Sequence, residues 1–494
     1  MQQFEIELND FEIDGKSFEL KLKIVTLTKM PQALSIFDIL LPPLYLLGAL
    51  AYGYYIKNKY IRTNPEYKYF IPGLLARIVG AIALGLVYFF YYGGGDTTNY
   101  HHSAVAYSNF VFTNKEDFLI ALIGDAKHHY FSFEVAGDVY HIYRPNDQHA
   151  FFVVRLLIPI VLMGFQSYFA SAILTAIFTY GGLWKLYQTF IQEFPSLRKE
   201  MAIACLFIPS CVFWGSGLMK DSFTLSAVGW FTYAFYNLFI KKQVKPKYIV
   251  YLIIASFIII AIKPYIFFAL LPGSILWLSN STIARINHKF IRGLLTPLFL
   301  GAGLIGGYFA LAQLGENLGA YQLDSVLDKA VVVQKDMKAS YYGGQSYDIG
   351  DFDASAGGVA LKAPSAIFAG IFRPGIWDVR NPVMAVSSLE NTYLLILTLF
   401  LLFKLKFFGF FKYIGANPLI LFSVCFSLFF AFSVGLTCAN FGSLVRLRIP
   451  ELPFFVASLF AIKYHYEQIE KNRFKSATQK KKQLNYQIKS GKIV

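Results

Sequence analysis

Charged residues are scarce in this sequence. Only 15% of the 494 residues are Asp, Glu, Lys or Arg, whereas 56% are hydrophobic and 18% are aromatic. A soluble globular protein usually has about a quarter of its residues charged. Several apolar runs reach the roughly 20 residues that a helix needs to cross a bilayer. The composition therefore excludes an ordinary soluble domain and predicts an all-α polytopic membrane protein.

Cysteines are also few, and their positions exclude two kinds of site. The four cysteines lie in or beside apolar runs, with neither the spacing of a metal site nor that of a disulfide framework. The first 30 residues are acidic and mixed rather than basic and then apolar, so we expect no cleavable signal peptide. We find no internal repeat.

Nearly half of the net charge of +15 comes from one end of the sequence. Residues 463–494 contain nine Lys or Arg and two Glu. A basic segment beside a membrane helix is typically a topology signal that also contacts anionic lipid. We therefore expect membrane lipid, and not nucleic acid, as a partner, with residues 466–494 as a cytoplasmic tail.

Eleven apolar segments are predicted to span the membrane. They are 36–56, 70–92, 151–184 (long, with a break near Gly164), 200–214, 222–240, 248–262, 266–279, 293–313, 388–406, 417–435 and 447–465.

The linkers between these segments sort by charge. Basic or mixed linkers belong in the cytoplasm by the positive-inside rule, namely 57–69, 185–199, 241–247, 280–292, 404–416 and the tail. Residues 93–149 have seven acids and three bases, and residues 314–362 have seven acids and four bases, so both belong outside. This gives a transmembrane domain over 36–465 with two sizeable outer loops, 93–149 and 314–387.

The N-terminal segment, 1–35, is predicted to form a short β-hairpin. Apolar and charged residues alternate on both sides of Asp14-Gly15, which is the pattern of two strands joined by a tight turn. The span count places this hairpin outside. The alternative is that segment 36–56, which Pro42-Pro43 interrupts, lies in the membrane–water interface or enters the membrane and returns to the same side.

Charged residues from six or seven separate segments fall at one level in this topology, the outer rim. Such charges are costly near a bilayer, so each is a candidate functional residue. They are Asp96, Arg155, Lys220, Asp221, Lys263, Arg373, Glu390, Arg446 and Arg448, with Trp377 beside them. Most are cationic, which suits a ligand that has phosphates and a lipid tail. Arg77, by contrast, is assigned to the cytoplasmic side as a topological charge.

The stretch "GGGDTTNYHH" supplies the remaining candidates. Asp96 is the candidate base or acceptor-positioning carboxylate. The three glycines before it allow close approach of the backbone and a sharp turn. Tyr100 and other aromatic residues of this loop suit stacking on sugars. His101 and His102 are adjacent and would point in different directions on a helix, so we assign no metal ligands. Six of the eight histidines lie in 93–149, however, so binding of a divalent ion, Mg or Mn, stays an open alternative.

Each candidate also has an ordinary structural explanation. Asp96 could be a solvated loop acid, and Lys220-Asp221 could be a self-paired turn between two helices. The Lys263 side chain could extend to the membrane–water interface. Arg373 and Arg446 could be anchors for headgroups.

Four stretches resemble known membrane proteins. "GGGDTTNYHHSAVAY" resembles the first-outer-loop motif of GT-C-type membrane glycosyltransferases, in which an acidic residue ends an early helix. "SLVRLRIPELPFFVASLFA" resembles the R-x-x-x-P-x-x-P start of a late helix in bacterial members and in some O-antigen polymerases. "PSCVFWGSGLMKDSFTLSAVGWFTYAF" and "FRPGIWDVRNPVMAVSSLEN" are similar to segments of polysaccharide-associated membrane proteins of Bacteroidetes.

The resemblance implies an enzyme of the bacterial inner membrane. Such enzymes transfer a sugar from a polyprenyl-phosphate donor, at the outer face, to a glycan, lipid or protein acceptor. The family's catalytic carboxylate corresponds to Asp96, and its phosphate-binding cations correspond to a set drawn from Lys220, Lys263, Arg373, Arg446 and Arg448. This chain departs from many members, which have a second early acidic motif and a large soluble C-terminal domain.

Three classes of function stay open. The first is a glycosyltransferase or an O-antigen-type polysaccharide polymerase, in cell-envelope polysaccharide synthesis. The second is a transporter of lipid-linked oligosaccharide (a flippase), which would place charges at mid-depth. The third is a non-enzymatic scaffold, in which the rim residues would be scattered around the circumference.

Overall fold

The computed structural model describes residues 35–113, 115–123, 132–135, 138–141, 143, 147–283, 332, 346–350 and 356–489. In these ranges the chain is helical apart from an antiparallel ribbon, β1 (Ser132–Val135) paired with β2 (Asp138–His141), and a single bridge between Ser346 and Asn440. The prediction of an all-α membrane protein is confirmed at this level. The expected N-terminal hairpin lies outside the described residues.

Five helices are long and apolar enough to cross a membrane. They are Phe37–Tyr60, Pro65–Tyr91, Tyr168–Glu193, Pro382–Gly415 and Pro418–Thr437. Four shorter helices are also apolar, namely Gln148–Met163, Pro246–Ile262, Pro264–Ser279 and Gly357–Phe372. Among the described residues, helix length and composition thus confirm a membrane protein but do not confirm eleven spans.

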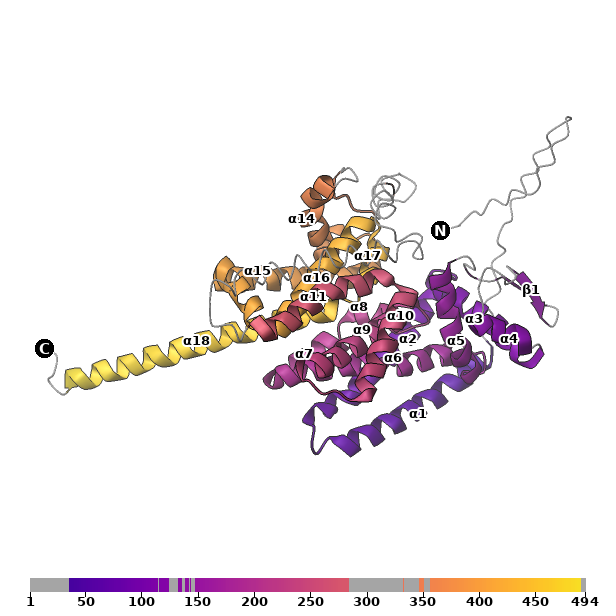
Figure 1. Cartoon of the computed structure of the whole chain (residues 1–494), viewed down its shortest axis with the longest axis horizontal. Helices are drawn as coiled ribbons and strands as arrows, with labels where there is room; N and C mark the ends of the chain where they lie inside the picture. Colours follow the sequence, from indigo (N-terminus) through magenta and orange to yellow (C-terminus); the bar gives the residue numbers. More distant parts are fainter. Residues whose placement is uncertain are drawn as a thin grey trace.

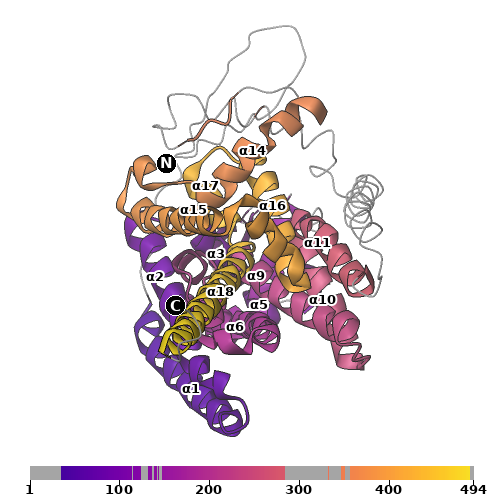
Figure 2. The same ribbon diagram turned by 90° about the vertical axis from the view of Figure 1, so that its left-hand side faces the viewer.

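One group of helices is built around α6. This helix packs against α1, α2, α7 and α9, and α9 in turn packs against α10. Figure 2 shows α1 and α10 on opposite sides of the body. The bounds are α1 (Phe37–Tyr60), α2 (Phe70–Leu86), α6 (Tyr168–Glu193), α7 (Arg198–Leu206), α8 (Pro209–Trp214), α9 (Lys220–Phe235) and α10 (Pro246–Ile262).

The second group is built around α16. This helix packs against α11, α14, α15 and α18. A short helix, α17, precedes α18, which projects far from the body (Figure 1). The bounds are α11 (Pro264–Ile283), α14 (Ala356–Phe372), α15 (Pro382–Ala416), α16 (Pro418–Thr437), α17 (Phe441–Leu447) and α18 (Leu452–Lys489). The basic segment expected as a separate tail therefore continues the last helix to Lys489.

Three further helices, α3 (Asp96–Thr113), α4 (Lys115–Ile123) and α5 (Gln148–Met163), gather at one end of the first group (Figure 1). The start of α5 is tied to the start of α9, because Asp147 pairs with Lys220. Just beyond the end of α5, the Tyr168 hydroxyl donates to Thr97 at the start of α3. Both ends of α5 therefore lie on the same side of the bundle.

The predicted long span 151–184 is thus two helices. The chain breaks at 164–167, where Phe165 and Gln166 have φ angles of 51° and 58°. The expected break near Gly164 is confirmed, but only α6 is long enough to cross a membrane.

Polar caps in the sequence set several helix starts. A side chain before the helix accepts hydrogen bonds from backbone N–H groups that have no partner within the first turn. These caps are Asp147, Ser167, Asn381, Asn417 and Asn440. Proline occupies the first position of α10, α15 and α16, where its missing N–H costs nothing.

Candidate functional site

Four charged side chains from four separate segments meet in one ion-pair network. The Arg446 guanidinium donates through Nη1 to the Asp96 carboxylate, and its Nε lies 2.7 Å from Oδ2 of Asp221. The Lys263 ammonium pairs with Oδ1 of Asp221. We call Asp96, Asp221, Lys263 and Arg446 the charge cluster.

Local structure brings each member to the same place. Gly93, Gly94 and Gly95 have φ angles of 68°, 129° and 140°, a region that favours glycine, and they turn the chain from α2 into α3. Asp96 and Asp221 then lie in the first turns of α3 and α9, where a helix dipole favours a carboxylate. Lys263 lies at the break between α10 and α11, and Arg446 lies in the last turn of α17.

The cluster is enclosed on one side and accessible on the other. The side chain of Asp221 is fully buried and that of Lys263 is 5% exposed, whereas Asp96 and Arg446 are 26% and 21% exposed. Burying charges is costly unless they are paired, and a buried pair is weak evidence of a role in stability alone. The accessible pair, Asp96 and Arg446, is therefore the part of the cluster that can meet a ligand.

The pairing corrects the sequence-based expectation of a mainly cationic rim. Two carboxylates balance the two cations of the charge cluster. The Lys263 side chain does not extend to the membrane–water interface, because it is buried against Asp221. Lys220 and Asp221 are not a self-paired turn, since each pairs elsewhere.

Tyrosines support the Asp96 end of the cluster. The Tyr143 hydroxyl donates to Oδ1 of Asp96. The Tyr100 ring, which is buried, meets the Tyr143 ring edge-on at 5.1 Å. Tyr100 was expected near the site and is there, one contact away from the carboxylate. Tyr143 was not expected, and no pattern around it in the sequence signals this role.

A second ion pair lies next to the cluster. The Lys220 ammonium is 3.1 Å from Oδ2 of Asp147, while Oδ1 of Asp147 caps α5. Partial burial raises the pKa of Asp147, but the Lys220 charge and the Ala150 N–H lower it more, so its pKa lies below the ordinary value. Asp147 was missed as a site residue, although an Asp just before an apolar run is a cap signal.

Arg448 belongs to a neighbouring polar group. Its guanidinium donates to the carbonyls of Ile371 and Arg373, at 2.9 and 3.0 Å, and to the Asn391 side chain. The carboxylate of Glu390 accepts from the Ser210 N–H at 2.8 Å. These contacts fix backbone and position helices, so they support a structural role for Arg448 and Glu390.

Arg373 and Trp377 differ from the expectation of a shared phosphate site. Arg373 pairs with Asp378 through two hydrogen bonds, 3.1 and 2.6 Å long. Its guanidinium also lies over the rings of Tyr347 and Phe441. Trp377 is exposed. Arg373 is thus held by protein groups, apart from the charge cluster.

Three other expected residues lie on α3 and α5. His101 and His102 lie on α3, and the His101 ring meets the Tyr168 ring edge-on. Burial lowers the pKa of His101 to about 4, so the imidazole is neutral at pH 7. Arg155 lies on α5, 4.7 Å over the ring of Phe151 one turn earlier.

Arg77 corrects another expectation. It is fully buried on α2, not exposed at a cytoplasmic surface. Its guanidinium donates to the carbonyl of Cys211, at 3.2 Å, and to the Thr179 hydroxyl, at 3.1 Å. Among the described residues its hydrogen-bond partners are all neutral, which is unusual for a buried cation inside a helix bundle.

Metal binding has no support from the geometry. The part of the chain that the structure describes contains no group of three or more His, Cys, Asp or Glu side chains placed to hold an ion. The described residues therefore do not offer a ligand set for the Mg or Mn ion considered from the sequence.

Comparisons of the chain with protein-family models, with curated proteins and with solved structures give no match.

Proposed function

We propose that this protein is a glycosyltransferase that uses a polyprenyl-phosphate-linked sugar in cell-envelope polysaccharide or glycoconjugate synthesis. The observation that carries the proposal is the bridge that Arg446 forms between Asp96 and Asp221. It puts a carboxylate suited to acceptor binding beside a cation suited to phosphate. Functional sites concentrate such buried, interacting charges.

The proposed setting is the outer face of the bacterial inner membrane, with eleven spans. The linker charges favour this orientation, since the basic linker 241–247 lies at the opposite end of α9 and α10 from Asp221 and Lys263. The charge cluster then faces outwards. A polyprenyl-linked donor would lie in the membrane with its phosphate at that level.

The mechanism begins with Arg446 changing partner. A donor phosphate offers the guanidinium a second anionic acceptor that can be bound through two parallel hydrogen bonds, so it can replace the Asp96 carboxylate as the partner. Release of Asp96 lets it orient the acceptor hydroxyl and take its proton. The acceptor oxygen then bonds to the sugar C1 as the bond from C1 to the phosphate oxygen breaks. Arg446 stabilises the charge that develops on the departing phosphate, as preorganised groups do in many enzymes.

The test is the variant Asp96→Asn in reconstituted protein, supplied with a panel of polyprenyl-phosphate- and diphosphate-linked sugars. We expect turnover to fall by about 10²-fold or more while donor binding is kept. The matched control is Glu116→Gln, an exposed carboxylate on α4. Retained turnover in Asp96→Asn would instead favour a polymerase, in which a diphosphate leaves without help from a strong base.

One observation favours the transporter class. Arg77 is a cation inside the bundle, seven residues after the start of α2, where mid-depth charges of a transporter are expected. A transporter would move a fluorescent lipid-linked sugar between leaflets of a vesicle without transferring the sugar. Sugar transfer in the same vesicles, with no leaflet exchange, would exclude this alternative.

A further inference from the structure

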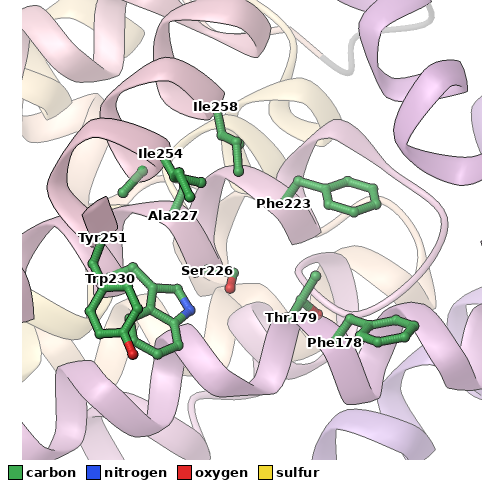
Figure 3. A pocket seen from close by; sticks show the side chains of 10 residues that line it. Phe178, Thr179, Phe223, Ser226, Ala227, Trp230, Tyr251, Ile254 and Ile258 are labelled. Atoms are coloured by element: carbon green, nitrogen blue, oxygen red, sulfur yellow. The ribbon is translucent and has the colours of Figure 1, made fainter. Parts of the chain in front are cut away.

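A pocket opens between three helices, and no residue of the charge cluster lines it. Its volume is about 260 Å³, and Figure 3 shows side chains of α6, α9 and α10 around it. The lining is apolar except for two hydroxyls and the polar groups of two aromatic rings. The residues are Phe178, Thr179, Phe223, Ser226, Ala227, Trp230, Tyr251, Ile254, Ala255 and Ile258.

The pocket opens on an apolar outer surface. Phe178 and Ile254 line it and are each about half exposed, at 53% and 52%. On the same helix as Ile254, the neighbouring side chains of Ile253 and Phe257 are exposed as well. An exposed apolar face of this kind on a membrane protein is the face that lipid covers. The pocket is therefore open to lipid chains from the side.

Small residues make room for the pocket. Ala227 and Ala255 are buried in its wall. A Cβ on Gly181 would lie 3.4 Å from the Trp230 ring, so the indole packs closely against α6 at this glycine. The Tyr251 ring also packs against the indole, with ring centroids 4.7 Å apart. The indole thus forms one wall of the pocket.

Two lysines lie beyond the indole. The Lys185 ammonium is 5.9 Å from the Trp230 ring centroid and 4.7 Å from that of Tyr233. It donates to the side chain of Gln188 at 2.8 Å. Lys247 lies 5.0 Å over the ring of Tyr248, which in turn meets the Tyr233 ring edge-on at 5.8 Å, so the two lysines flank one pair of tyrosines. Neither lysine has a carboxylate partner within 4 Å among the described residues. This end of the pocket therefore has two uncompensated positive charges.

We propose that the pocket binds one acyl chain of an anionic glycerophospholipid whose phosphate is held by Lys185 and Lys247. The volume suits part of a chain, since pockets for whole small ligands usually occupy about 300–1,000 Å³. The lipid belongs to the leaflet on the side of the basic linker 241–247, opposite the charge cluster. This site is separate from the proposed sugar-transfer site and does not depend on it.

Quenching of Trp230 fluorescence by brominated lipid tests the proposal. Full-length protein is reconstituted in phosphatidylcholine vesicles that contain, at equal mole fraction, either phosphatidylglycerol or phosphatidylcholine brominated on the acyl chains. The chain has five tryptophans, so the difference between the natural protein and Trp230→Phe isolates the signal from this indole. We expect brominated phosphatidylglycerol to quench Trp230 at a several-fold lower mole fraction than brominated phosphatidylcholine.

Substitution of the two lysines tests whether they hold the lipid phosphate. In Lys185→Gln/Lys247→Gln the several-fold preference for phosphatidylglycerol should fall to near one, because both charges that attract the anionic headgroup are removed. Lys241→Gln is the matched control, because Lys241 pairs with Glu193 at 3.2 Å and should keep the preference. Equal quenching by both lipids in the natural protein would overturn the proposal without needing any variant. A preference that survives the double substitution would also overturn it. Displacement of the bromolipid by an uncharged polyprenol would assign the pocket to an isoprenoid chain instead.

Discussion

Lys263 and Asp221 form an ion pair that is almost fully enclosed by protein, with side chains 5% and 0% exposed. Asp221 also accepts from Arg446, so one buried carboxylate serves two cations. The pair links the break between α10 and α11 to the start of α9. Its position next to the accessible Asp96 and Arg446 makes it the fixed half of the charge cluster.

Removing one partner of this pair should cost more than removing both. Asp221→Asn leaves Lys263 buried without a carboxylate, which typically costs about 3–5 kcal/mol. The double variant Asp221→Asn/Lys263→Met should recover part of that loss, with a coupling energy of about 0.5–3 kcal/mol. Apparent melting temperatures of the detergent-solubilised proteins give the comparison. Additive losses would show that the pair is not coupled.

Arg446→Lys should impair sugar transfer while keeping the positive charge. A guanidinium donates to Asp96 and Asp221 at once through separate nitrogens. An ammonium is a compact point charge that cannot reproduce this planar arrangement of donors. We expect turnover to fall by about 10- to 100-fold in the assay used for Asp96. Arg380→Lys, at an exposed position, is the control and should leave turnover unchanged. Equal turnover of Arg446→Lys and the natural protein would contradict a bridging role.

Gly182→Ala should separate α6 from α9. A Cβ at position 182 would lie 2.0 Å from the Ser226 carbonyl oxygen, and backbone atoms cannot swing aside. We expect a loss of about 1–3 kcal/mol in stability, as is usual for overpacking. Gly48→Ala is the control, because nothing lies within 4 Å of its added methyl group. It should be neutral or stabilising by up to about 1 kcal/mol. Similar melting temperatures for both variants would refute the close approach.

Asp147 has two roles that substitution can separate. Asp147→Ala removes both the cap of α5 and the partner of Lys220. Asp147→Ser keeps a capping oxygen and removes only the ion pair, which is partly exposed and contributes at most about 1 kcal/mol. We therefore expect the alanine variant to be less stable than the serine variant by about 1 kcal/mol, measured as a difference in melting temperature. Equal losses would show that the cap does not contribute.

His101 should make stability depend on pH. Its pKa is lowered by burial to about 4, whereas an unfolded chain has a histidine pKa near 6.5. The unfolded state therefore binds more protons between these values, and stability falls as the pH drops below about 6.5. The expected loss from pH 7 to pH 5 is about 1–2 kcal/mol. His101→Gln should melt with a weaker dependence on pH over this range. An identical slope would assign the effect to other groups.

Sequence reasoning could find the members of the charge cluster because all four lie at the ends of predicted spans, at one level of the predicted topology. Asp96 follows an apolar run, Asp221 and Lys263 lie in short turns, and Arg446 precedes the last helix. A topology argument places such residues at one level. It cannot choose partners, because pairing depends on how the helices pack around the circumference. The pairing of Arg446 with two carboxylates, and the contribution of Tyr143, needed coordinates.

The sequence also could not place α5. Its 16 residues are as apolar as many spans, and composition alone does not tell a helix that crosses a bilayer from one whose ends lie on one side. Burial of Arg77 was missed for a related reason. A lone arginine in an apolar run marks a membrane boundary or an interior hydrogen-bonding site equally well, and only its neighbours Thr179 and Cys211 decide between them.

The order in which the chain is synthesised has a consequence for the charge cluster. Lys263 is synthesised 42 residues after its partner Asp221, whereas Arg446 is synthesised 350 residues after its partner Asp96. Until then the nascent protein holds an acidic group near its membrane-inserted helices without the guanidinium that later neutralises it. Insertion of α17 is therefore a late step that completes the electrostatics of segments made much earlier.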